Sequence, residues 1–96
     1  MAVSIYLENE AHERIAYVGD DPDESFIAVC REASEGSWLA TVNPWGDTMF
    51  NVPQLEQFVG ELIQIPEEQK SAVIRQVADM AQKAVLLRGY LFISGD

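Results

Sequence analysis

Four acidic side chains gather within five positions of the chain, around a single proline. They are Asp20, Asp21, Asp23 and Glu24. Clustered carboxylates attract cationic protein surfaces, and hard cations such as Ca²⁺ also take them as ligands. Their spacing differs from that of the twelve-residue calcium loop, so the structural interpretation is a strand end followed by a helix cap. The functional interpretation is that the cluster attracts a basic partner.

Nucleophilic and metal chemistry would depend on residues that this chain holds in single copies. His12 is the only histidine and Cys30 the only cysteine. His12 lies among acids in a polar segment and Cys30 falls on the apolar stripe of a predicted helix, which does not favour a base–nucleophile pair. A structural zinc site needs four ligands, mainly Cys and His, and the scattered glycines form no phosphate loop. We therefore expect no catalytic residue, no metal and no cofactor, and a protein that is not an enzyme.

The segment around Trp45 has the composition of a tight turn that carries an aromatic ring. Asn43 and Asp47 stand on either side of this tryptophan, with a proline and a glycine between them. Interfaces gain much of their binding energy from aromatic anchors ringed by polar groups. We therefore predict that Trp45, Asn43 and Asp47 contact a partner. The alternative is that the indole folds back over Met49 or over the helix that begins near Val52.

The net charge of −10 is confined to the first two thirds of the chain. Residues 1–65 hold twelve acids against two arginines, whereas residues 66–96 hold four acids and four bases. Such a field attracts cationic surfaces over about a Debye length, roughly 8–10 Å, and it repels phosphate groups. We expect a basic protein partner and binding neither to nucleic acid nor to a membrane.

A chain of 96 residues corresponds to one domain, spanning residues 1–96. The first residues lack the basic segment of a signal peptide, and no apolar run reaches the roughly 18 residues that cross a bilayer. A cytoplasmic location is therefore the expectation.

The elements that would position these groups follow from hydrophobic periodicity and capping signals. Strands are predicted over 3–8, 14–18, 38–42, 48–50 and 90–93, and helices from the acidic cluster to about 34, over 51–65 and over about 67–88. The order β-β-α-β-β-α-α-β favours an α+β fold. We predict a mostly antiparallel sheet of about five strands with the helices packed mainly on one face.

Alternation along the first strand separates the two faces of the predicted sheet. If helices cover the face with Val3, Ile5 and Leu7, the opposite face carries Ser4, Tyr6 and Glu8, joined, depending on register, by Tyr17, Tyr90 and Phe92. Phenol rings bury large areas at low entropic cost and accept polar neighbours. We therefore predict that Tyr6 and Tyr17 also contact a partner. The alternative is that a helix crosses this face and the rings belong to the core.

The segment 43–51, followed by Gln54, resembles a pattern of small uncharacterised bacterial proteins. In that pattern Pro, an aromatic residue, Gly-Asp-Thr, Phe-Asn and Gln recur, and the chain closes on a strand that ends in Gly-Asp, as at residues 95–96 here. The resemblance bears on the fold and implies no activity. In size, acidity and lack of catalytic groups the chain is also similar to immunity proteins that neutralise bacterial toxins.

The two likenesses and the charge lead to two functional hypotheses. The first is an acidic interaction module, most concretely an immunity or inhibitor protein that docks on a basic partner such as a toxin. Asp20, Asp21, Asp23 and Glu24 would steer the encounter and Trp45 would anchor it. The alternative is a structural or regulatory subunit that acts as a homodimer.

Overall fold

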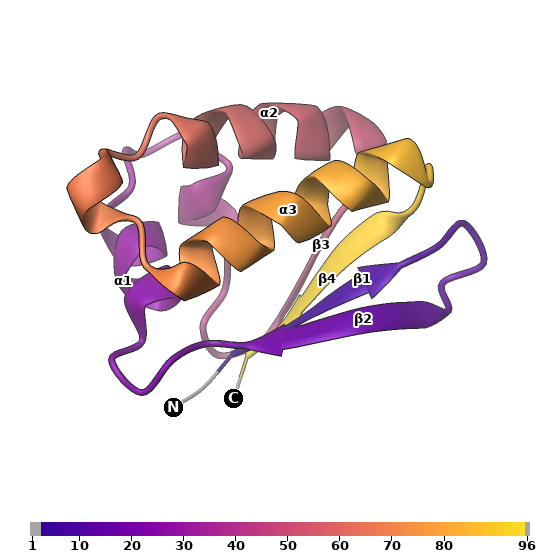
Figure 1. Cartoon of the computed structure of the whole chain (residues 1–96), viewed down its shortest axis with the longest axis horizontal. Coiled ribbons are helices and arrows are strands. Elements are labelled where there is room, and N and C mark those ends of the chain that lie inside the picture. Colours follow the sequence, from indigo (N-terminus) through magenta and orange to yellow (C-terminus); the bar gives the residue numbers. More distant parts are fainter. Residues whose placement is uncertain (1–2, 96) are drawn as a thin grey trace.

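An antiparallel sheet and a layer of helices on one of its faces make up the structure, a computed structural model that describes residues 3–95 (Figure 1). The strands are β1 (Ser4–Glu8), β2 (Arg14–Gly19), β3 (Asp47–Phe50) and β4 (Tyr90–Ser94), in the spatial order β2-β1-β4-β3. The helices are α1 (Ser25–Glu32), α2 (Val52–Ile63) and α3 (Ala72–Leu86). The predicted α+β class is confirmed, with four strands in the described residues instead of about five.

The segment 38–42, predicted to be a strand, holds a short 3₁₀ turn at Leu39–Thr41. The carboxylate of Glu61 in α2 accepts hydrogen bonds from the backbone N–H groups of Trp38 and Leu39, both at 2.9 Å. Thr41 Oγ1 donates to the Trp38 carbonyl at 2.6 Å. The N–H groups of Trp38 and Leu39 are donors that a strand could offer to a neighbouring strand, so a tertiary contact with Glu61 overrides the local β propensity.

The last helix begins at Ala72, later than the predicted start near Glu67. Its N-cap is Ser71, whose extended backbone breaks the helix and whose hydroxyl accepts a hydrogen bond from the Ile74 N–H at 3.3 Å. Glu67–Gln69 form a separate 3₁₀ turn directly after Pro66. A serine cap therefore sets this boundary rather than the proline upstream.

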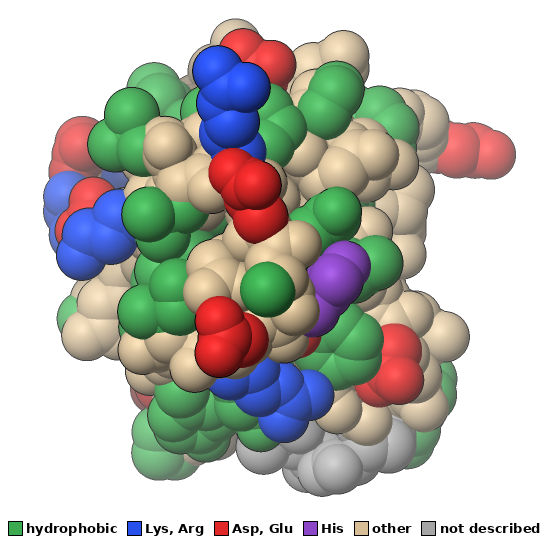
Figure 2. All heavy atoms as spheres, turned by 90° about the vertical axis from the view of Figure 1, so that its right-hand side faces the viewer, with side chains coloured by type: hydrophobic (Ala, Val, Ile, Leu, Met, Phe, Trp, Pro, Cys, Tyr) green, Lys and Arg blue, Asp and Glu red, His purple; other side chains and the backbone are tan. Residues whose placement is uncertain are grey.

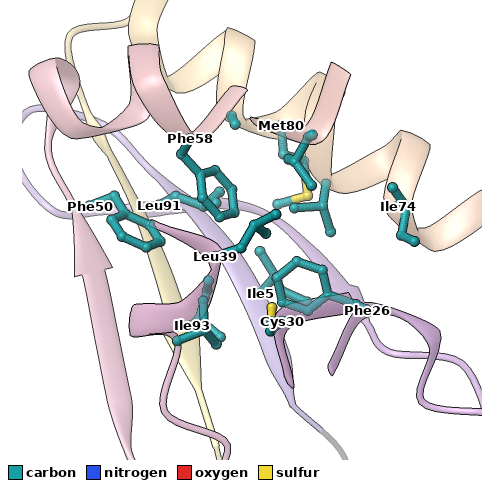
Figure 3. Packing of buried hydrophobic residues seen from close by; sticks show 14 of the residues in the cluster. Ile5, Phe26, Cys30, Leu39, Phe50, Phe58, Ile74, Met80, Leu91 and Ile93 are labelled. Carbon is teal, nitrogen blue, oxygen red and sulfur yellow. The ribbon is translucent and has the colours of Figure 1, made fainter. Parts of the chain in front are cut away.

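The hydrophobic core lies between the sheet and the helices (Figure 3). Phe50 of β3 stacks on Phe58 of α2 with ring centroids 4.7 Å apart, and Trp38 meets Phe50 edge-on at 6.3 Å. On β1 and β4 the buried hydrophobic positions alternate, and they are Ile5, Leu7, Leu91 and Ile93. The helices therefore cover one face of the sheet, as predicted, and leave the other uncovered.

The longest helix of residues 3–95 is α3, with 15 residues. Within that part of the chain, no helix combines the length and the apolar character needed to cross a membrane.

Candidate partner-binding face

A continuous row of large side chains crosses the face of the sheet that the helices leave uncovered. Tyr17, Tyr6, Phe92 and Met49 are successive cross-strand partners on β2, β1, β4 and β3. Neighbouring strands lie about 4.8 Å apart, so this aromatic row spans the sheet over about 14 Å. Its two ends are open to solvent, because Tyr17 is 61% exposed and Met49 47%.

The rings of the aromatic row touch one another and already hold one guanidinium group. The ring centroids of Tyr6 and Tyr17 are 5.3 Å apart, and those of Tyr6 and Phe92 are 6.4 Å apart. The guanidinium carbon of Arg14 lies 3.9 Å from the Tyr6 centroid and 5.4 Å from that of Phe92. This is cation–π geometry. The row therefore offers ring faces that suit a cation.

The hairpin between β1 and β2 borders one side of the row. Glu8 is buried, and its carboxylate lies 3.0 Å from His12 Nδ1 and 3.8 Å from Arg14 Nε. The His12 ring stacks on Tyr90 at 4.1 Å between centroids. A register shift between Leu7 and Glu8 brings these groups together. Figure 2 views this end of the molecule, where hydrophobic, acidic and basic side chains and the imidazole are intermixed.

Asp20 and Asp21 supply hydrogen-bond acceptors to the first turn of α1. Asp20 accepts from the backbone N–H groups of Phe26 and Ile27 at 3.0 and 3.1 Å. Asp21 accepts from the Ser25 N–H at 2.8 Å and from its hydroxyl at 2.6 Å. These bonds, the one from the Ser25 hydroxyl foremost, hold the pKa of Asp21 below its ordinary value. Both carboxylates thus fill the capping role that the sequence offers as the structural interpretation.

The other members of the acidic cluster sit in the same loop. Asp23 is exposed and Glu24, the N-cap of α1, adopts a left-handed backbone conformation with φ of 55°. Gly19, the last residue of β2, lies in the cross-strand row that continues through Ser4 and Ser94 to Asp47. The acidic cluster and Asp47 therefore stand at opposite corners of one end of the sheet.

Trp45 is 68% exposed, which favours its interpretation as an anchor over the alternative of a ring folded back on the protein. Its turn is held in place locally: Asn43 Oδ1 accepts from the Trp45 N–H at 2.9 Å, and the Asn43 N–H donates to Thr48 Oγ1 at 2.9 Å. The turn leads directly into β3, whose exposed Asp47 shares the uncovered face with Met49. Asp47 thus adjoins the Met49 end of the aromatic row, and the turn with Trp45 directly precedes it in the chain.

Sequence reasoning placed Tyr6 and Tyr17 on the uncovered face and considered Phe92, but it did not include Met49 or Arg14. Met49 carries a usable signal, because its neighbour Phe50 is apolar and adjacent strand residues face opposite ways. Arg14 carries no sequence signal of this kind, because its position over the Tyr6 ring depends on the register shift beside Glu8.

Cys30 lies on the core side of α1 and is 5% exposed. Burial, with a smaller contribution from the Asp20 carboxylate, raises the pKa of its thiol to about 12. Because the thiolate is the nucleophile, we expect iodoacetamide at pH 8 to alkylate Cys30 at least about a hundredfold more slowly in the native protein than in urea. Mass spectrometry of timed aliquots measures both rates. Similar rates in the two conditions would contradict the buried position.

The uncovered face of the sheet presents two tyrosines, a phenylalanine and a methionine in one row. Within residues 3–95, no three His, Cys, Asp or Glu side chains come together in a way that could hold a metal ion. The aromatic row and Arg14 lie on the side of the sheet that the helices leave uncovered. Comparisons of this chain with protein-family models, with curated proteins and with solved structures find no significant match.

Proposed function

We propose that this protein is a binding module for a basic protein and that the uncovered sheet face is its interface. The observation that carries the proposal is the aromatic row, which crosses all four strands and is open at both ends. Tyrosine and methionine are enriched at protein interfaces, where a few aromatic anchors supply most of the binding energy. In the described residues the helices pack on the other face of the sheet, so no helix covers this row.

The charge around the row favours a basic partner. Segments 3–20 and 43–50, which carry three of the strands, contain five acidic residues and a single arginine. That arginine, Arg14, lies over the Tyr6 ring and so gives an intramolecular example of the contact. An arginine from the partner would stack in the same way on Tyr17, the most exposed ring of the row.

The most concrete form of this proposal is an immunity or inhibitor protein. A toxin that acts on nucleic acid holds phosphates in a basic cleft, and carboxylates can occupy such a cleft in their place. Exposed acids such as Asp23 and Asp47 would steer the encounter, and Trp45 and Tyr17 would then be buried. The contributions of Asp20 and Asp21 come through their charge, because their oxygens also serve α1.

The test begins with identification of the partner and ends with the purified pair. Affinity capture from cells of the source organism, followed by mass spectrometry, names the protein, and calorimetry then measures Kd. We expect Tyr17→Ala to raise Kd by about tenfold or more, because it removes an anchor ring. The association rate constant should fall by about tenfold between 50 and 300 mM salt, since steering is screened.

Leu86→Ala is the matched control for the binding test. Leu86 is 83% exposed but belongs to α3, in the helical layer. The Leu86→Ala substitution also removes exposed apolar surface, but it does not touch the aromatic row, so Kd should stay within about twofold of the unmodified value. The proposal fails if Tyr17→Ala leaves Kd unchanged, or if the captured protein is acidic and binds equally well at high salt.

A further inference from the structure

One edge of the sheet is protected and the other is open to pairing. The strands β3 and β2 form the two edges. β3 has four residues, begins with Asp47 and follows closely on Pro44, features that natural proteins use to block edge-to-edge association. β2 has six residues, and its centre, residues 15–18, is Ile-Ala-Tyr-Val without lysine or proline. β2 therefore has the composition of a strand that pairs on both sides.

The backbone of β2 directs part of its hydrogen-bonding groups away from the sheet. The Asp20 N–H donates to the Val3 carbonyl at 3.1 Å, and β1 and β2 are antiparallel from there on. In an antiparallel ladder, hydrogen-bonded and non-hydrogen-bonded residue pairs alternate along the strands. The backbone N–H and C=O groups of Val18 and Ala16 therefore point toward β1. The N–H and C=O groups of Tyr17 and Gly19 consequently face outward. A further strand can bond to them without disturbing the sheet.

A groove runs beside this edge, between β2 and α3. Its walls combine residues 16–18 of β2, Tyr17 of the aromatic row included, with Asp79, Met80 and Lys83 of α3. Toward the hairpin the groove continues past Ile15, Leu86 and Leu87, which are 52%, 83% and 44% exposed. A second copy of this chain that pairs through β2 would thus bring its own helical layer toward these apolar side chains.

The charges that line the groove complement a second copy of themselves. Asp79 and Lys83 lie one helical turn apart on α3, both exposed, and neither has an ion-pair partner within 4 Å in residues 3–95. A twofold axis through the edge of β2 sets α3 antiparallel to its copy. Each Asp79 then approaches Lys83 of the second copy, so that the ion pair forms twice.

We infer that two copies of this chain pair through β2 into a continuous eight-stranded antiparallel sheet, with Asp79 and Lys83 matched across the dimer axis. The pairing leaves the uncovered face of each sheet free. With Tyr17 opposite Tyr17 of the second copy, the two aromatic rows would join into one row that crosses the whole sheet. The dimer thus goes beyond the proposed function by doubling the surface offered to a partner.

Sedimentation equilibrium of the full chain between about 1 and 200 µM measures the dimer Kd directly. Ile15→Lys places a charge at the edge and should raise Kd by at least about tenfold. Asp79→Lys and Lys83→Asp each create like-charge contacts and should do the same. The double variant Asp79→Lys/Lys83→Asp restores opposite charges across the axis, so its Kd should return to within about threefold of the unmodified value.

All of these positions are exposed, and none belongs to the aromatic row, so the fold and the face proposed for partner binding stay intact. The thermal unfolding midpoint of each variant, compared with that of the unmodified protein, tests whether the fold stays intact. A protein that remains monomeric at 200 µM would overturn the inference. So would a dimer whose Kd is insensitive to Ile15→Lys, or a charge-exchanged double variant that dimerises no better than the single ones.

Discussion

Gly89→Ala should lower the free energy of unfolding by about 3 kcal/mol, a large share of the stability of a domain this size. Gly89 connects α3 to β4 where the chain passes the end of β1. A Cβ atom at this position would collide with the backbone carbonyl of Glu8 and lie 3.0 Å from the Asn9 Cα. Both are backbone atoms, and the β1–β4 ladder holds Glu8 opposite Tyr90. The strands would have to separate, and urea denaturation measures the loss.

Gly60→Ala is the control, because it makes the same chemical change in an open place. Gly60 lies within α2, and, apart from its chain neighbours and the backbone of its own helix, no atom of the described residues stands within 4 Å of an added Cβ. Alanine favours the helix over glycine by about 0.5–1 kcal/mol, so this variant should be more stable than the unmodified protein. Equal stability of the Gly89→Ala variant and the unmodified protein would contradict the close approach of β1 to the residue before β4.

Gly89 also illustrates where a correct prediction has a different physical basis. Its place after an apolar helical stripe predicts a helix end near Arg88, and α3 ends two residues earlier, at Leu86. The left-handed residue of that helix end, however, is Arg88, with φ of 55°. Glycine is needed at 89 because of the neighbouring strand, and strand order does not follow from local sequence.

Elements whose signals are local were predictable, and those fixed by distant contacts were not. The start of α2 is visible in the sequence as Asn51 and Gln54, and both bonds of that capping box form, at 3.2 and 2.9 Å. The turn at Leu39–Thr41 depends on Glu61, more than twenty residues further along the chain. In the segment Trp-Leu-Ala-Thr-Val, three of the five residues, Trp38, Thr41 and Val42, favour strands, and none of the five signals the contact with Glu61.

The candidate face, too, was predictable only where its residues are placed by local signals. Period-two alternation placed Tyr6, and the hairpin register then placed Tyr17 beside it. To predict the other half of the aromatic row one must know the strand order β2-β1-β4-β3, because that order puts Phe92 and Met49 in line with Tyr6 and Tyr17. An acidic cluster supports two interpretations from sequence, and only the hydrogen bonds at the start of α1 assign Asp20 and Asp21 to the helix.

Phe50→Ala should lower the free energy of unfolding by about 3–5 kcal/mol, the range for removing a buried phenylalanine ring. Phe50 is 2% exposed and contacts Phe58 of α2 and Trp38, so it links β3 to two segments of the helical layer. The cavity left behind cannot collapse easily, because Phe58 lies on a helix that packs on the sheet as a unit. Guanidinium denaturation followed by circular dichroism measures the change.

Met49→Ala is the natural comparison, since the two residues are adjacent on β3 and face opposite sides of the sheet. Met49 is 47% exposed, and its truncation should cost less than about 1 kcal/mol of stability. On the proposed function, however, it shortens the aromatic row, so partner affinity should fall while the fold persists. Strand alternation thus assigns stability to one face and recognition to the other. Equal losses of stability at the two positions would mean that something covers the face we describe as open, and the interface would then have to lie elsewhere.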